Sequence, residues 1–241
     1  MKKLILLGGL LTLAGVAQAT VYTYNFTGGF ANGGVVPDGN VTGWSDNRSV
    51  SLVSDFGPLR PGETTDIRDV NVKLNITGGY NGDLYGYLVH SSGFAVLLNR
   101  SGKTGSDAFG YGDAGYNITL DDAAANGDIH LYRLTQNPSG GTLTGTWTPD
   151  GRNVNPATVV DTDSPSALLG SFNGTSADGT WTLFLADMSG GDVSTVAGWG
   201  LEISVVPEPT TWAMIIFGVV AALWKLRQYV PKRQLARIKR I

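Results

Sequence analysis

The sequence predicts an all-β protein whose central part folds as two packed antiparallel sheets. Three segments, 70–77, 116–121 and 199–205, alternate strictly between apolar and polar residues. A period of two is typical of strands with one buried face. Short turns rich in glycine, asparagine, aspartate and proline separate the apolar segments, and no helical period lies between them. Many short strands joined by tight turns favour a β-sandwich.

Three further segments, 85–90, 94–99 and 181–186, are denser in apolar residues, which predicts strands covered on both faces. We expect residues 20–35 to add an edge strand and a linker, and residues 36–205 to form the sandwich itself. This length is enough for one domain with a sizeable core, and we find no internal repeat in it.

Residues 1–19 have the three parts of a secretory signal peptide. Two lysines give a positive start, residues 4–16 form an apolar stretch, and residues 17–19 read Ala-Gln-Ala, a small-x-small cleavage site. We expect signal peptidase to cleave after Ala19, which places the following domain outside the cytoplasm.

An apolar segment near the C-terminus predicts a single transmembrane helix over residues 211–226. Its uncharged run from Trp212 to Trp224 would span roughly 20 Å as a helix, against a hydrocarbon core of roughly 30 Å. Flanking threonine and lysine side chains would extend the span toward the headgroups. The alternative is a helix buried in the core of a domain, because apolar runs this short are ambiguous.

The residues around this helix resemble a known sorting signal. Residues Val206-Pro207-Glu208-Pro209 form a stiff, helix-free spacer, and seven Lys or Arg residues with no acidic residue follow Trp224. By the positive-inside tendency, the basic tail, 227–241, is cytoplasmic. Spacer, apolar helix and basic end are similar to the PEP-CTERM signal of Gram-negative bacteria.

This resemblance implies cleavage by an exosortase near the Pro-Glu-Pro spacer. It implies a protein held at the inner membrane until processing and then placed at the cell surface or in the extracellular matrix. The basic tail continues further beyond the helix than is usual, so a permanent membrane anchor is the alternative.

Composition limits what the exported part can bind. Without residues 1–19 and 206–241 it keeps 8 of the 17 basic residues and 19 of the 20 acidic ones, so it is about eleven units negative. Nucleic acid is therefore excluded as a partner, because phosphate binding needs clustered Lys and Arg. The absence of cysteine excludes disulfides and thiolate metal sites.

Residues 36–205 resemble the P domain, also called the P/Homo B domain, of the proprotein convertases. The matching blocks are Pro37-Asp38-Gly39-Asn40, Gly43-Trp44-Ser45-Asp46, residues 67–76, Gly82-Asp83-Leu84, Gly179-Thr180-Trp181-Thr182-Leu183 with Asp187, and Gly198-Trp199-Gly200-Leu201. The resemblance implies a jelly-roll sandwich. In the convertases this module follows a subtilisin-like domain and supports its folding. Only about 17 residues separate Ala19 from Pro37, so we expect no protease domain before it.

Calcium is the cofactor that the acidic loops suggest. Hard cations take oxygen ligands from loops, and P domains often bind one. Asp83 and Asp187 fall in matching blocks, with Asp69 and Asp192 near in sequence. The alternative is that these carboxylates only close turns and cap strands.

The residues give little support for catalysis. Neither His90 nor His130 has a second histidine or cysteine at ligand spacing, so we expect no transition metal. Ser176, in Gly-Thr-Ser-Ala, lacks the sequence context of a histidine base. We therefore predict a protein that is not an enzyme.

Three functions are compatible with the sequence. The favoured one is a non-catalytic surface or matrix protein that binds polysaccharide or another exported protein through the sandwich loops. The second is an accessory P domain that stabilises a separately encoded exported serine protease. The third is an unrecognised exported hydrolase, whose first candidate residues would be His130 and Asp121.

Overall fold

The computed structural model describes residues 19–91, 93–205 and 209–229. The predicted signal peptide up to residue 18, the Val206-Pro207-Glu208 part of the sorting motif and the tail beyond Tyr229 lie outside the described residues. One compact unit, Thr20–Pro58 with Thr65–Val205, holds the strands of both sheets. A second unit includes Leu59–Thr64 and the helix α2.

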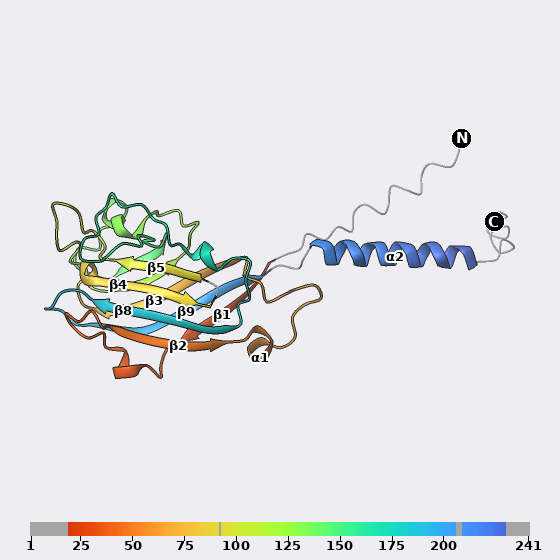
Figure 1. Cartoon of the computed structure of the whole chain (residues 1–241), viewed down its shortest axis with the longest axis horizontal. Coiled ribbons are helices and arrows are strands. Elements are labelled where there is room, and N and C mark those ends of the chain that lie inside the picture. Colours follow the sequence, from red (N-terminus) through yellow and green to blue (C-terminus); the bar gives the residue numbers. More distant parts are fainter. Residues whose placement is uncertain (1–18, 92, 206–208, 230–241) are drawn as a thin grey trace. The chain divides into compact units, whose positions relative to one another are not determined.

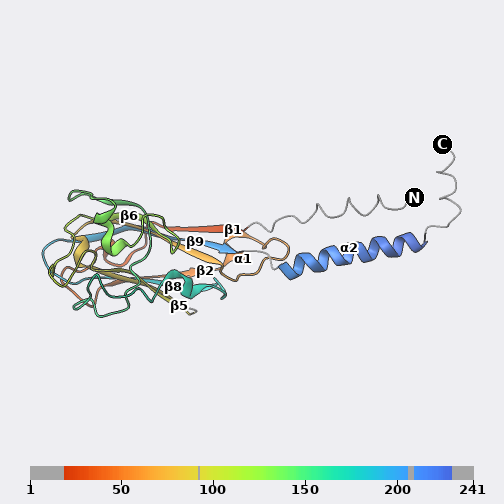
Figure 2. The ribbon, with the colours of Figure 1, turned by 90° about the horizontal axis from the view of Figure 1, so that it is seen from above.

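The strands form two sheets that face each other in two layers (Figures 1 and 2). The five-stranded sheet has the order β1 (Thr20–Phe26), β9 (Ser194–Val205), β3 (Asp69–Gly78), β6 (Tyr116–Leu120) and β7 (Leu143–Trp147). The four-stranded sheet has the order β2 (Trp44–Val50), β8 (Gly179–Asp187), β4 (Leu84–His90) and β5 (Gly93–Asn99). The predicted all-β architecture of two sheets is confirmed, while the jelly-roll connection stays a prediction.

The core lies between the sheets and follows from the alternation of the sequence. In β3 the buried residues are Val70, Val72, Leu74 and Ile76, and the residues between them point outward. Trp181, which is fully buried, comes from the facing sheet. Each strand of this kind therefore presents one apolar face to the core and one face to the exterior.

The prediction of a purely antiparallel sandwich is wrong at one edge, where β6 and β7 run parallel. Residues 121–142 connect these two strands and include the 3-10 helix η3 (Ile129–Leu134). A connection of this length can return the chain to the starting end of the sheet, which a tight hairpin cannot do.

The prediction that three strands are covered on both faces holds for β5 alone. The loop residues Asp150 and Ala167 exchange backbone hydrogen bonds with Leu97 and Val96, and the strand is buried from Ala95 to its end. In contrast, β4 alternates between buried and half-buried residues, and so does β8 up to Phe184. The outward side chains of β4 and β8 are aromatic or β-branched. In these two strands the dense apolar run therefore indicates an outer face with apolar side chains and not a second covered face.

The remaining helices are short, apart from α2. They are α1 (Leu52–Phe56) and the 3-10 helices η1 (Ala31–Gly34), η2 (Asn81–Asp83) and η4 (Leu169–Phe172). The side chain of Ser51 caps α1 by accepting a hydrogen bond from the backbone N–H of Ser54.

The apolar C-terminal segment forms the helix α2 (Pro209–Tyr229), which includes the predicted range 211–226. The prediction that it crosses a membrane is not supported. By length and apolar character, no helix in the described part of the chain meets what a membrane crossing requires.

Candidate functional site

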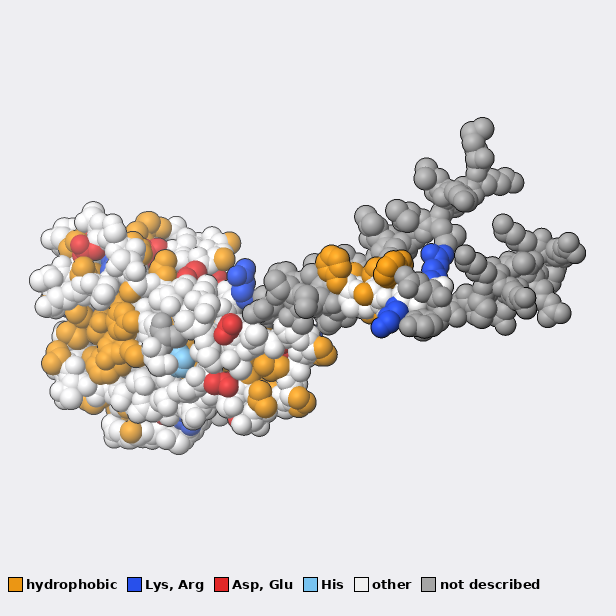
Figure 3. All heavy atoms as spheres, turned by 45° about the vertical axis from the view of Figure 1, so that its right-hand side comes forward, with side chains coloured by type: hydrophobic (Ala, Val, Ile, Leu, Met, Phe, Trp, Pro, Cys, Tyr) orange, Lys and Arg blue, Asp and Glu red, His pale blue; other side chains and the backbone are white. Residues whose placement is uncertain are grey.

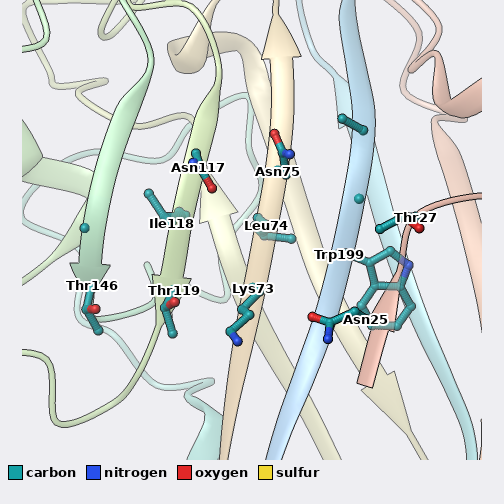
Figure 4. Close-up of a pocket in the computed structure, with 13 residues that line it drawn as sticks. Asn25, Thr27, Lys73, Leu74, Asn75, Asn117, Ile118, Thr119, Thr146 and Trp199 are labelled. Carbon is teal, nitrogen blue, oxygen red and sulfur yellow. The ribbon is translucent and has the colours of Figure 1, made fainter. Parts of the chain in front are cut away.

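The outer face of the five-stranded sheet carries a groove of about 480 Å³ (Figure 4). All five strands or the residues next to them contribute to its lining. The polar side chains among the lining residues are Asn25, Thr27, Lys73, Asn75, Asn117, Thr119 and Thr146. The sequence predicts binding through the loops, whereas the hollow lies on the face of a sheet.

The strand register arranges these side chains in two rows across the sheet. In the first row Asn75 lies between Asn117 and Gly198. In the second row Lys73 lies beside Thr119 on one side and Gly200 on the other. Because outward residues alternate along each strand, the two rows are about 7 Å apart. The groove therefore presents two parallel lines of amide and hydroxyl groups, with the Lys73 ammonium in the second line.

Two glycines of β9 lie at the centre of the sheet. Gly198 lies opposite Asn75 and lines the groove, and Gly200 lies opposite Lys73. A side chain at Gly200 would collide with the carbonyl oxygen of Tyr24 in the neighbouring strand β1. Glycine at this position is therefore required for the close approach of β1.

Trp199, between these glycines, points into the sandwich. Its indole Nε1 donates a hydrogen bond to Asp46 Oδ2 at 2.7 Å, and its ring lies 4.7 Å from the ring of Phe26. Trp199 is 3% exposed and lines the groove at its floor. The Gly-Trp-Gly sequence thus makes both the core contact and the hollow above it.

The groove is electrically neutral. Lys73 is the one ionisable side chain among its lining residues, and its Nζ lies 2.6 Å from Glu202 Oε1. Glu202 points outward from β9 between Thr23 and Asn71, at the border of the groove. Within the described residues, the three groove asparagines form no hydrogen bond through their side chains, so their amides are available to a ligand.

The four-stranded sheet has a different outer face, which we call the aromatic face: Tyr85, Tyr87, Phe94 and Phe184. The rings of Tyr87 and Phe184 are stacked with centroids 4.6 Å apart and an interplanar angle of 15°. Tyr85 and Phe94 pack edge-on or tilted against Tyr87 at 5.8 and 5.3 Å. Hydrophobic side chains gather over this side of the domain in Figure 3. The four side chains of this face carry no charge at neutral pH, because a phenol is protonated there.

The four predicted calcium ligands are not brought together. Asp83 and Asp187 lie side by side, because Leu84 pairs with Asp187, and the charge of Asp192 acts on Asp83. Asp69 begins β3, whereas Gly78 at the other end pairs with Ser194. Ten residues of strand place Asp69 about 30 Å from that end. It lies instead near the charges of Asp121 and Asp122.

Asp83 and Asp187 share a partly satisfied site. Arg100 donates to Asp83 Oδ1 at 3.2 Å, while Asp187 Oδ2 is buried without a hydrogen-bond partner. Burial raises the pKa of Asp83 to about 6 and also raises the pKa of Asp187. Across the described residues, no three His, Cys, Asp or Glu side chains form a group that could hold a metal ion. Calcium at Asp83 and Asp187 stays a prediction.

His130 belongs to a buried charge network. Its Nδ1 lies 2.8 Å from Asp150 Oδ2, and its Nε2 lies 2.9 Å from the carbonyl oxygen of Lys103. Burial favours the neutral ring, but the hydrogen bond to Asp150 and the charge of Asp150 reverse this and raise the pKa of His130. A ring that donates from both nitrogens carries a positive charge, so it is not poised as a general base.

The other residues considered for catalysis have separate local roles. Asp121 Oδ1 accepts a hydrogen bond from the backbone N–H of Ala123, which closes a turn. His90 stacks on Trp181 with centroids 4.4 Å apart, and burial lowers its pKa. Neither residue contacts the ring of His130, whose two nitrogens are engaged by Asp150 and Lys103.

Comparison with known proteins gives a distant likeness to solved structures. No family model matches the chain, and no curated protein matches it. Among solved structures, the chain is similar to the crystal structure of the Aeromonas sobria serine protease (ASP) and the chaperone (ORF2) complex. The sequence identity is 12% and the TM-score 0.41. The match covers 79% of this chain and 27% of that chain, so this chain spans well under a third of its length.

Proposed function

We propose that this protein is an exported, non-catalytic binding domain that holds a polysaccharide in the groove of its five-stranded sheet. The observation that carries the proposal is the double row of amide and hydroxyl side chains along an open hollow, in which Glu202 neutralises the charge of Lys73. Delivery to the cell surface or matrix by signal peptidase and an exosortase is proposed from the sequence resemblance.

The chemistry of the groove suits a sugar. An asparagine amide offers both donors and an acceptor, and a threonine hydroxyl both donates and accepts. Sugar hydroxyls have the same dual character, so Asn25, Asn75 and Asn117 can each form paired hydrogen bonds with neighbouring hydroxyls. Ordered water can bridge the longer contacts without weakening them.

The same lining argues for binding without hydrolysis. A glycosidase places two carboxyl groups about 5 to 10 Å apart across the scissile bond. The residues that line the groove include no Asp or Glu, and the neighbouring carboxylate, Glu202, is held by Lys73. This supports a domain that retains its ligand unchanged.

Filling the groove tests the proposal. Ala197 lines the hollow and is exposed, so Ala197→Tyr would place a ring in it without removing a polar group. We expect this variant to bind the polysaccharide extracted from the host's own extracellular matrix at least about tenfold more weakly. Co-sedimentation of the full chain with that polysaccharide is the measurement.

The matched control is Ala157→Tyr, which adds the same ring at an exposed loop position. It should bind as the wild type does, and thermal melts should show that both variants are folded. The proposal fails if the wild type does not co-sediment, or if Ala197→Tyr binds as well as Ala157→Tyr.

A second function is favoured by the aromatic face of the four-stranded sheet. Tyr and Phe are enriched at the centres of protein interfaces, where charged residues are depleted. The stacked pair of Tyr87 and Phe184 on an uncharged sheet face has this composition. It suits an accessory module that stabilises a separately encoded exported serine protease, which is the role that the P-domain resemblance implies.

A charge in this face tests the second function. We expect the full chain to prolong the thermal half-life of fluorophosphonate-reactive protease activity in the host's secreted fraction, and Phe184→Lys to abolish the effect. Phe109→Lys, at a phenylalanine that is 66% exposed outside the face, is the control and should keep it. Equal half-lives with and without the wild-type chain would contradict this function.

A further inference from the structure

We infer that the groove selects uncharged, linear polysaccharides over polyuronates, and that the Lys73–Glu202 pair sets this preference. The inference rests on the proposed function, because it names the class of polysaccharide that the same groove takes. It assigns to Glu202 a role in specificity through the charge of Lys73.

The shape of the groove points to a linear chain that crosses the strands. Its lining extends from Thr146 in β7 to Asn25 and Thr27 at the end of β1, which is the full width of the sheet. Five strands at their usual spacing are about 19 Å wide between the outer two. The two polar rows run in this same direction, so an extended chain between them meets side chains along both of its edges.

The electrostatics of the groove point to an uncharged chain. At 2.6 Å, Glu202 neutralises Lys73, the one cation among the described residues that line the groove. Lys73 and Glu202 are 39% and 29% exposed at their side chains, so the pair is open to a ligand and to salt. The acidic exported part, about eleven units negative, adds a general repulsion of polyanions.

The position of Glu202 allows the charge of Lys73 to be changed without changing the shape of the groove. Its carboxylate contacts Lys73, but Glu202 is not one of the residues that line the hollow. Glu202→Gln therefore releases the Lys73 ammonium into an unchanged groove. A free ammonium can then form a charge-assisted hydrogen bond with a uronate carboxylate.

The experiment measures binding of the full chain by calorimetry to hexamannuronate and to the neutral fraction of the host's matrix polysaccharide. We expect the wild type to bind the neutral fraction and to bind hexamannuronate at least about tenfold more weakly. Glu202→Gln should bind hexamannuronate about five- to tenfold more tightly than the wild type, with a gain that disappears at high salt.

Two controls make the gain specific. Glu63→Gln removes the same charge at a loop position outside the groove and should give no gain. The double variant Lys73→Met with Glu202→Gln should lose the gain again. The inference is overturned if Glu202→Gln shows no gain, if Glu63→Gln shows the same gain, or if the wild type prefers hexamannuronate. Failure of the wild type to bind any matrix polysaccharide would instead overturn the proposed function.

Discussion

Asp150→Ala should lower the free energy of unfolding by about 3–5 kcal/mol, because it leaves the buried His130 ring without its carboxylate and leaves Arg152 with Asp128 as its remaining carboxylate partner. Asp150 is fully buried, with Oδ2 at 2.8 Å from His130 Nδ1 and Oδ1 at 3.3 Å from Arg152 Nη1. Its Oδ2 also accepts from the backbone N–H of Asn99 at 3.2 Å. His130 has no other anionic partner in the described hydrogen bonds.

Urea unfolding followed by tryptophan fluorescence measures this loss. Domains are commonly stable by about 5–15 kcal/mol, so the variant should be close to unfolding at 37 °C. Asp192→Ala, at an exposed carboxylate, is the control and should change stability by less than about 0.5 kcal/mol. A loss for Asp150→Ala as small as that of the control would show that the network contributes little to stability.

The alternation of the sequence predicts the central strands well. Segments 70–77, 116–121 and 199–205 became β3, β6 and most of β9, since burial of one face imposes the period that the residues show. The strands β2 and β7 were not predicted. Both combine few apolar residues with polar or glycine positions inside the strand, so their pairing depends on neighbours far away in the sequence.

The groove could not be predicted because it is made by register. Asn25, Asn75 and Asn117 are far apart in the chain and become neighbours only through β9 and the pairing of β3 with β6. A usable signal was nonetheless present. The outward positions of these alternating strands are mostly Asn, Thr and Gly, where a solvated face more commonly carries charges. Outward positions that are mostly Asn, Thr and Gly across several predicted strands can therefore indicate a binding face on a sheet.

Two predictions differ from the structure because a local sequence pattern does not show what lies elsewhere in the fold. Asp69 was grouped with Asp83, yet β3 carries it to the opposite end of the sheet. The apolar run 85–90 predicts burial on both faces, yet Tyr85 and Tyr87 form an outer aromatic face. The length of β3 separates Asp69 from Asp83, and in the described part of the chain no further layer covers the outer face of the four-stranded sheet at Tyr85 and Tyr87. A local sequence pattern shows neither of these features.

The pH dependence of stability should reveal the Asp83–Asp187 pair. A carboxyl with a raised folded-state pKa contributes stability that is full below its unfolded pKa of 3.8 and is lost as the pH rises through about 6. In EDTA, we therefore expect Asp83 to make the domain about 1–1.5 kcal/mol more stable at pH 5 than at pH 7. Burial raises the pKa of Asp187 too, so it acts in the same direction.

Urea unfolding at the two pH values, in EDTA, measures the difference for the wild type and for Asp83→Asn. Asp83→Asn should remove about 1–1.5 kcal/mol of the pH dependence, whereas Asp192→Asn should keep most of it, because the charge of Asp192 is the smallest of the causes that shift the pKa of Asp83. Identical pH dependence in the wild type and Asp83→Asn would contradict the raised pKa. Thermal melts of the same proteins in excess calcium test the calcium prediction. A bound cation holds both carboxylates ionised, so it makes stability rise with pH. A calcium-dependent rise in Tm at pH 7 that Asp187→Asn abolishes would show that the buried Oδ2 of Asp187 binds a cation. An unchanged Tm would show that Asp83 and Asp187 bind protons but no calcium.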